Sequence, residues 1–300
     1  MTRCATIFVF LILAVAGISV AGPSSALAAT GYSIEEAKVY VKTKNWNGLL
    51  AYAQGWTQVA PKDPDAWEFL GIAYGSKDLH IGLERPREAL DAFRHAVTLK
   101  PVFPEVWNAL GLVAREIGRY DEAIDALTRA TQQAPSKANY WHNLAGTYAG
   151  TRKYSLALNA LNGMERACRS DVEWYFLAND FQALGTASDP QLYSRAIGAY
   201  RRALQLNPRF AAAWNNMGAT EQLRGNVQAA LTDYQRASAL GDPAGANNYN
   251  NLKSAIASSS AAAQPQCTLY VPGGGGSTPM GQRRRVPCTQ FGPSPWTPLP

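Results

Sequence analysis

Few side chains in this sequence have the types and spacing that catalysis or metal binding requires. The three histidines, His80, His95 and His142, lie far apart in the chain, and none belongs to a His-Glu-x-x-His motif. The sequence also lacks a Gly-x-Ser-x-Gly elbow, a Cys-x-x-Cys pair and a Walker-type loop. Gly273–Gly276 is not followed by the lysine and helix that a phosphate cradle needs. We therefore expect a protein that is not an enzyme and has no cofactor or metal ion.

Asparagine is the residue whose spacing suggests binding, because it recurs close behind a series of aromatic residues in segments of helical character. Asparagine is a poor helix former, so its recurrence needs an explanation. A primary amide carries donors and an acceptor, and it can bond the backbone of an extended peptide without reading its sequence. The alternative is that these amides bond neighbouring helices. The asparagines concerned are Asn108, Asn143, Asn179, Asn215, Asn216, Asn250 and Asn251.

Two recurring residue patterns predict the helices that carry these amides. A tryptophan is followed by Leu or Met three positions later and by Gly or Ala four positions later, which places all three on one helix face. The second phrase has alanine, a large apolar residue and, in four of five cases, another alanine at helical offsets, and proline often ends it. Small residues let the two helices approach closely. The opening tryptophans are Trp67, Trp107, Trp141, Trp174 and Trp214.

These paired phrases resemble tetratricopeptide repeats. The resemblance implies an all-α fold, a right-handed superhelical solenoid of antiparallel helix pairs. Two units carry six extra residues between their helices, at Lys77–Arg87 (the first insertion) and Thr186–Ser194 (the second insertion). Sel-one-like repeats lengthen the same turn, but the plain spacing of the other units favours the tetratricopeptide family. The insertions are either neutral loops or an edge contact for a partner.

The resemblance sets the expected organisation of the chain. Residues 259–300 contain no Asp or Glu and are rich in Gly, Pro and Ser, so they cannot bury enough apolar surface to fold. The predicted segments are a signal peptide at 1–28, a degenerate helix pair at 30–63, repeats at 64–103, 104–137, 138–170, 171–210 and 211–244, a capping helix at 245–258 and a disordered tail at 259–300.

The resemblance also implies where a partner binds, because the first helices of such repeats line a concave channel. The inward positions hold Glu68, Asn108, His142, Tyr175 and Asn215. None is lysine, so the carboxylate clamp of chaperone-tail receptors in this family is not expected. As a hypothesis, the partner-binding residues are Asn108, Arg115, His142, Asn143, Tyr175, Asn179, Asn215, Asn216, Asn250 and Asn251.

The N-terminus has the three parts of a secretory signal peptide. Arg3 precedes the apolar run Ile7–Val20, and Ala26-Leu27-Ala28 offers a small-x-small cleavage site. The sequence therefore predicts export to the periplasm or beyond the cell, with cleavage near Ala28. Retention of the segment as a membrane anchor is the alternative.

The cysteines and the net charge give no sign of catalysis, but they limit the kinds of partner that the chain can bind. We expect Cys168 to be a buried apolar side chain, and we hypothesise a disulfide between Cys267 and Cys288. The formal net charge is +6, half of which is supplied by Arg283–Arg285 in the tail, so no basic stripe for nucleic acid is expected on the folded body. These arginines could make a weak contact with an anionic envelope surface, or simply keep the tail soluble.

Together these features predict a non-catalytic scaffold that binds an extended protein or peptide partner and serves cell-envelope assembly. An accessory subunit that delivers a substrate to a separate envelope enzyme is the alternative. The sequence does not indicate an oligomeric state.

Overall fold

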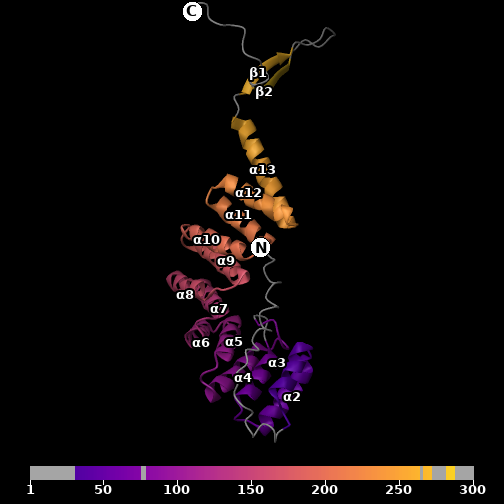
Figure 1. The fold of residues 1–300 in the computed structure, drawn as a ribbon, viewed down its shortest axis with the longest axis vertical. Coiled ribbons are helices and arrows are strands. Elements are labelled where there is room, and N and C mark those ends of the chain that lie inside the picture. The colour runs from indigo at the N-terminus through magenta and orange to yellow at the C-terminus, as the bar shows by residue number, and fades with distance from the viewer. Residues whose placement is uncertain (1–30, 76–78, 264–265, 272–281, 288–300) are drawn as a thin grey trace, which may run out of the picture. The chain divides into compact units, whose positions relative to one another are not determined.

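A computed structural model describes residues 31–75, 79–263, 266–271 and 282–287, which form two compact units divided after Pro208 (Figure 1). The predicted signal peptide at 1–28 lies outside the described residues. Within the described ranges, no helix is both long enough and apolar enough to cross a bilayer.

The first unit is a succession of helix pairs, and each range expected to hold a pair contains two helices. The connections within and between the pairs are short, apart from the two insertions. The helices are α1 (Ile34–Lys42), α2 (Trp46–Val59), α3 (Pro64–Tyr74), α4 (Pro86–Leu99), α5 (Pro104–Glu116), α6 (Tyr120–Gln133), α7 (Ala138–Gly150), α8 (Tyr154–Ala167), α9 (Asp171–Ala187) and α10 (Leu192–Leu206).

The recurring tryptophan is explained by a hydrogen bond to the preceding helix pair. The indole Nε1 of Trp141 donates to the carbonyl oxygen of Pro135 at 2.9 Å. Trp67 and Trp107 make the same bond, each to the proline six residues earlier, at 2.8 Å. The proline ends the second helix of one pair, and the indole of the next first helix bonds the carbonyl oxygen of that proline. The recurring spacing of tryptophan and proline within the chain therefore determines the geometry of the junction between two successive helix pairs.

The recurring small residues are explained by close packing inside each pair. A Cβ atom added to Gly71 would stand 2.5 Å from the ring of Phe93. A Cβ atom at Gly111 would come equally close to the side chain of Leu127. Both facing side chains are buried. The first and second helices of these pairs therefore approach as closely as the sequence pattern predicts.

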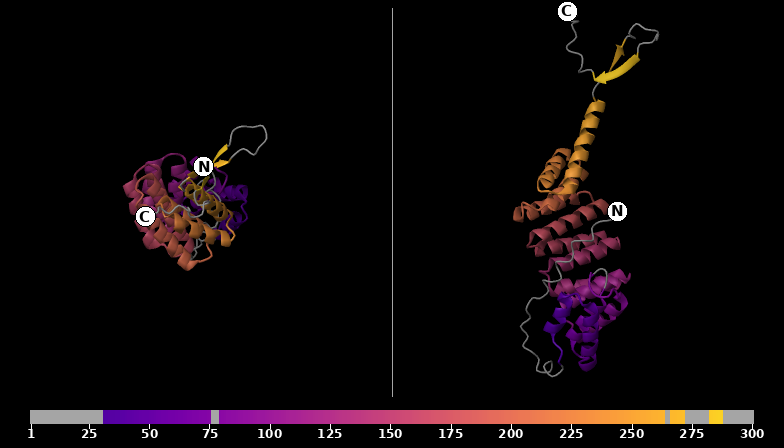
Figure 2. Two further views of the ribbon diagram at one scale, coloured as in Figure 1. Left: turned by 90° about the horizontal axis from the view of Figure 1, so that it is seen from above. Right: turned by 90° about the vertical axis from the view of Figure 1, so that its right-hand side faces the viewer.

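Three successive first helices of this unit, α5, α7 and α9, pack against one another. The helix α7 packs against both α5 and α9 as well as against its own partner α8, whereas the described second helices have no comparable contacts with one another. The stack therefore bends toward the first helices. We call the surface formed by α3, α5, α7 and α9 the first-helix face, and the opposite layer, formed by α4, α6, α8 and α10, the second-helix face (labelled in Figure 1, with two further views in Figure 2).

The two insertions fold differently. In the first insertion, Gly75 and Gly82 both have positive φ and lie against each other, so a side chain at Gly75 would strike the backbone 1.9 Å away. The amide of Arg85 then returns to the carbonyl of Tyr74 at 2.9 Å. In the second insertion part of the extra length is helix, because α9 continues to Ala187. Neither insertion is a simple extended loop.

The second unit holds α11 (Ala211–Leu223), α12 (Val227–Ala239) and α13 (Pro243–Ala263), and α13 packs against both other helices. The helix α13 is the expected cap, but it runs five residues past the predicted end.

Within the predicted tail the structure describes two strands, β1 (Gln266–Val271) and β2 (Gln282–Pro287). They pair antiparallel, with Cys267 opposite Val286. The segment β1 contains Thr268, Tyr270 and Val271, residue types that favour strands. The disulfide stays a prediction, because Cys288 lies outside the described residues.

Candidate partner-binding face

The predicted asparagine series is present on the first-helix face, but its members bond one another. The side-chain amide of Asn143 on α7 donates to the side-chain oxygen of Asn108 on α5 at 2.8 Å. Asn143 is only 8% exposed. This pair therefore joins two successive first helices, which is the second of the two roles considered for these amides. Each side chain still keeps polar atoms that this bond does not use.

A second polar pair lies beside the first. His142 Nδ1 on α7 meets Asp180 Oδ2 on α9 at 2.5 Å. Burial opposes the imidazolium, but the charge and hydrogen bond of Asp180 outweigh it and raise the pKa of His142, while the charge of Arg115 acts in the opposite direction. The sequence analysis missed Asp180. Its only signal was its position one helical turn after Phe176, whose ring lies 5.9 Å from that of His142.

Two other predicted residues face the core more than the channel. The side-chain oxygen of Asn179 accepts a 2.6 Å hydrogen bond from the hydroxyl of Tyr200, a fully buried residue of α10. Tyr175 is 9% exposed, and its ring packs against those of Phe176 and Tyr200. The structure therefore assigns Asn179 to contacts within its own helix pair and buries most of Tyr175.

The second unit repeats the amide pairing. The amide of Asn215 donates to Asn216 at 3.1 Å, and Asn248 on α13 donates to Asn215 at 2.9 Å. The predicted Asn250 and Asn251 are exposed on α13 and take no part in this chain of bonds. The sequence analysis missed Asn248. This residue comes directly before Tyr249, in the position that Tyr140 holds before Trp141.

Three polar groups on the first-helix face stand apart from this pairing. Glu68 on α3, Glu105 on α5 and Tyr140 on α7 make no hydrogen bond or ion pair with any described residue. Glu68 and Glu105 are partly buried, and Tyr140 is only 3% exposed. We call these three residues the acidic cluster. The sequence analysis placed Glu68 on the inward side and did not single out the other two.

The charges of the acidic cluster influence one another. Burial raises the pKa of Glu68 to about 8, and the charges of Asp65 and Glu105 add to this effect. Burial and the charges of Glu105 and Glu68 likewise raise the pKa of the Tyr140 hydroxyl. A carboxylate held in this environment favours its neutral form until a positive charge approaches.

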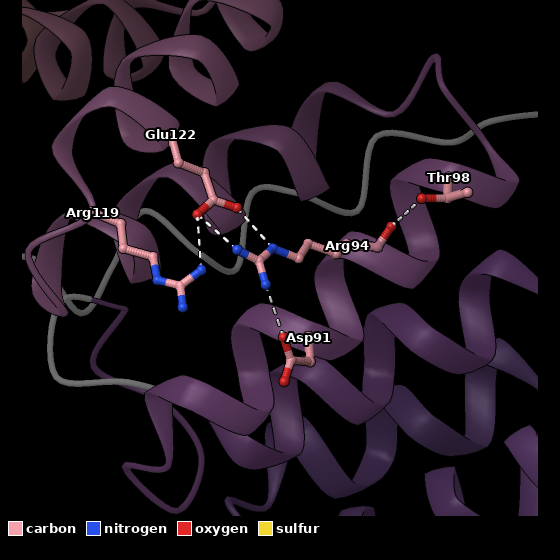
Figure 3. Close-up of polar contacts among 5 residues, drawn as sticks. All are labelled: Asp91, Arg94, Thr98, Arg119 and Glu122. Atoms are coloured by element: carbon pink, nitrogen blue, oxygen red, sulfur yellow. Dashed lines mark hydrogen bonds and ion pairs between the residues drawn. The ribbon is translucent and has the colours of Figure 1, made fainter.

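The second-helix face contrasts with the acidic cluster because its charges are paired. Arg94 on α4 makes two hydrogen bonds to Glu122 on α6, at 2.7 and 2.8 Å, and a third to Asp91 at 3.0 Å (Figure 3). Arg119 also approaches Glu122, at 3.6 Å. With Trp107, Arg94 and Glu122 line a hollow of about 220 Å³. These groups fasten one repeat to the next. Among the described residues, no group of three or more potential ligands is placed to hold a metal ion.

Comparison with known proteins gives a family match over just over half of the chain. The model of the tetratricopeptide repeat matches residues 78–138, 116–172 and 191–247. Human "Protein O-mannosyl-transferase TMTC1" is 28% identical over 160 residues, which are 53% of this chain and only 18% of that protein.

Solved structures show the same fold. The C-terminal part of a TPR repeat-containing protein from Cytophaga hutchinsonii has a TM-score of 0.57 at 12% identity, covering 73% of this chain and 83% of that one. Pseudomonas aeruginosa pilF has a TM-score of 0.55 at 18% identity, covering 77% and 97%. At these identities the likeness concerns the fold alone.

Proposed function

Because this chain belongs to the tetratricopeptide-repeat family, we propose that it is an exported, non-catalytic scaffold that binds an extended protein segment along its first-helix face. Folds of this family are generally protein-binding scaffolds, and stacked repeats create long surfaces suited to extended partners. The chain spans under a fifth of the length of its human transferase relative, so that protein's activity is not transferred to this one.

The observation that carries the proposal is the contrast between the two faces of the first unit. On the second-helix face, Arg94, Asp91 and Glu122 satisfy one another. On the first-helix face, the acidic cluster is left without partners among the described residues. No buried side-chain polar atom of the described residues lacks a hydrogen-bond partner, so the polar atoms of the acidic cluster reach solvent, where a bound segment can contact them.

The asparagine pairs contribute to this face in a second way. The Asn108–Asn143 bond uses one donor and one acceptor, so the remaining amide atoms can bond the backbone of a partner segment. Backbone bonding of this kind supplies affinity without sequence specificity. The acidic cluster, one helical turn away on α5 and α7, would then select among partners.

The cellular setting rests on residues 1–28, whose composition is that of a secretory signal peptide. We propose that the mature scaffold begins near Ala29 and serves assembly in the cell envelope. Terminal sequencing of the protein recovered from the periplasm or medium tests this part. Recovery of the unprocessed chain only from the cytoplasm would contradict it.

A matched pair of crosslinking variants tests the binding face. Gly146 on α7 and Gly198 on α10 are both exposed, and an added side chain at either meets at most a distant guanidinium. A photoreactive phenylalanine at Gly146 should crosslink a defined partner, whereas the same residue at Gly198 should not. Crosslinking of the same partner from both positions would exclude a preference for the first-helix face.

A further inference from the structure

The junction between α8 and α9 lacks the hydrogen bond that fastens three earlier junctions. At those junctions an indole bonds the carbonyl oxygen of a proline six residues before it. Six residues before Trp174 the chain has Cys168 instead. The carbonyl oxygen of Cys168 accepts a 2.7 Å hydrogen bond from the guanidinium of Arg169, and the indole of Trp174 bonds no described residue. The helices α8 and α9 also contact each other less than α6 and α7 do, so this junction depends on other contacts.

Two polar links cross this junction, one on each face. On the second-helix face, Arg195 of α10 donates to Asn162 and Glu165 of α8, at 2.8 and 2.6 Å. On the first-helix face, His142 Nδ1 of α7 lies 2.5 Å from Asp180 Oδ2 of α9, and both side chains are 22% exposed. A guanidinium keeps its charge, whereas an imidazole is the side chain whose charge changes between about pH 5 and pH 8. The two links therefore respond differently to pH.

The charges that act on His142 come from both neighbouring first helices. Asp180 on α9 attracts the imidazolium, and Arg115 on α5 repels it. Arg115 extends over α7 at Gly146, where an added Cβ atom would lie 3.8 Å from the guanidinium. Because the attraction of Asp180 outweighs burial and Arg115, the pKa of His142 is raised above its ordinary value of 6.5. The charged residues of α8, the remaining neighbour of α7, lie in its last turn and are Glu165 and Arg166.

Deprotonation of His142 weakens its link to Asp180. A neutral imidazole can still donate through Nδ1, but a hydrogen bond between charged groups is roughly twice as strong as one between neutral groups. Because the pKa is raised in the closed junction, the link has its full strength below about pH 6.5 and weakens as the pH rises through the higher folded value. The Asn108–Asn143 bond, which joins α7 to α5, contains no titratable group, so pH acts on one side of α7.

We propose that the His142–Asp180 pair is a pH-sensitive brace, which holds α7 to α9 when the imidazole is charged and lets the α8–α9 junction open when it is neutral. Arg195 keeps its charge and holds the second-helix side closed, so the opening widens the first-helix face between α7 and α9. The rigidity of that face then follows the pH of the surroundings. The brace does not depend on the proposed function, because it concerns the folded chain alone.

The first test is an NMR titration of the ring protons of the three histidines in the mature protein. His142→Gln identifies the signal of His142 by its loss. We expect this signal to titrate above pH 6.5, and we expect Asp180→Asn to move its midpoint below 6.5, because burial and the charge of Arg115 then act alone. A wild-type midpoint at or below 6.5 would overturn the proposal.

Hydrogen exchange of the α9 amides measures the opening itself. By linkage, every unit by which the pKa of His142 exceeds 6.5 favours the open junction about tenfold more at high pH than at low pH. The protection of α9 in the wild type, divided by that in His142→Gln, should therefore fall between about pH 5 and about pH 9 by the factor that the titration predicts. Asp180→Asn should behave as His142→Gln does. The same ratio for α6, whose junction with α7 has the indole–proline bond, should stay constant.

The control substitution is His95→Gln, which makes the same replacement at an exposed histidine of α4. It should leave the pH dependence of exchange in α9 as it is in the wild type. Equal effects of His95→Gln and His142→Gln would show a general charge effect, and a constant ratio in α9 despite a raised midpoint would show that the pair does not close the junction. Either result overturns the brace. Crosslinking from Gly146 tests the proposed function separately, since none of these measurements involves a partner.

Discussion

Two regions of the same pair of helices differ in how their polar groups are satisfied. One turn of α5 and α7 carries Asn108 and Asn143, which bond each other at 2.8 Å. The preceding turn carries Glu105 and Tyr140, which bond no described residue. Both regions are polar and both lie on the first-helix face. The chemical type of a residue therefore does not reveal whether it stabilises the fold or awaits a partner.

This difference predicts opposite effects of substitution. Removing one member of a bonded pair leaves the other buried without a partner, which lowers the free energy of unfolding. Removing a group that has no partner in the folded chain leaves nothing unsatisfied, so stability should hardly change while binding suffers. The following substitutions test that distinction, from the largest expected effect on stability to the smallest.

Trp141→Ala sets the upper end of the scale on the same helix. The indole bonds the carbonyl of Pro135, and its ring occupies the space that a Cβ atom at Gly163 would enter at 2.5 Å. We expect a loss of up to about 3–5 kcal/mol, the usual cost of removing a large aromatic side chain from a core, because the indole is only partly buried. Urea unfolding measures the loss. Trp141→Phe should cost less, since it keeps most of the ring. A loss below about 1 kcal/mol for Trp141→Ala would show that the indole junction does not hold the repeats together.

Asn143→Ala tests the bonded region. Because Asn143 is 8% exposed and its partner is another first helix, we expect a loss of about 1–3 kcal/mol. Adding Asn108→Ala should cost little more, and the double-mutant cycle should give a coupling of about 0.5–1.5 kcal/mol. The exposed Asn250→Ala is the control, with a change within about 0.5 kcal/mol. If Asn143→Ala and Asn250→Ala lowered the free energy of unfolding equally, the Asn108–Asn143 hydrogen bond would not stabilise the fold.

Glu68→Gln tests the acidic cluster through the pH dependence of stability. The pKa of Glu68 is about 8 in the folded chain against an ordinary value of 4.5. Between these values the folded state binds more protons than the unfolded state, so the free energy of unfolding falls as the pH rises. One pKa unit corresponds to about 1.4 kcal/mol, and solvent at this partly exposed group reduces the effect. We therefore expect the wild type to lose about 1–2 kcal/mol relative to Glu68→Gln between pH 5 and pH 8.

The control for this profile is Asp121→Asn, which replaces a fully exposed side chain of α6 and whose stability should change with pH as the wild type does. Parallel profiles for the wild type and Glu68→Gln would mean that Glu68 is solvated in the folded chain. That result would remove the electrostatic support for the acidic cluster while leaving the bonded region untouched.

The sequence was sufficient to predict the fold, because the spacing of apolar residues within each repeat predicts its two helices. The positions of Trp67, Leu70 and Gly71 on one face follow from the helical period alone, and the structure places them between the helices as expected. The inward positions came from the family resemblance; Asn108 lies on α5 and His142 on α7, and their role in binding stays a prediction.

The partners of those residues could not be predicted in the same way. Which side chains meet across two helices depends on the axial offset between them, and the offset is set by packing. Asn143 reaches back 35 residues to Asn108, whereas His142 reaches forward 38 residues to Asp180. Tyr140 was overlooked because a large aromatic residue next to Trp141 resembles core. Only the influence of the charges of Glu105 and Glu68 on its hydroxyl distinguishes it.

Tyr140→Phe should have the smallest effect on stability and is therefore the sharpest test of the comparison. The substitution removes one oxygen atom that no described residue bonds, and the ring stays in its buried place. We expect the free energy of unfolding to stay within about 0.5 kcal/mol of the wild type, because no hydrogen bond within the described chain is lost. Crosslinking of the partner from Gly146 should nevertheless weaken. Tyr200→Phe is the matched control, since its hydroxyl bonds Asn179 at 2.6 Å and its loss should lower stability by about 1 kcal/mol without affecting the crosslinking. If Tyr140→Phe destabilised the protein as Tyr200→Phe does, its hydroxyl would be a structural group, and the two regions of the first-helix face would no longer differ in kind.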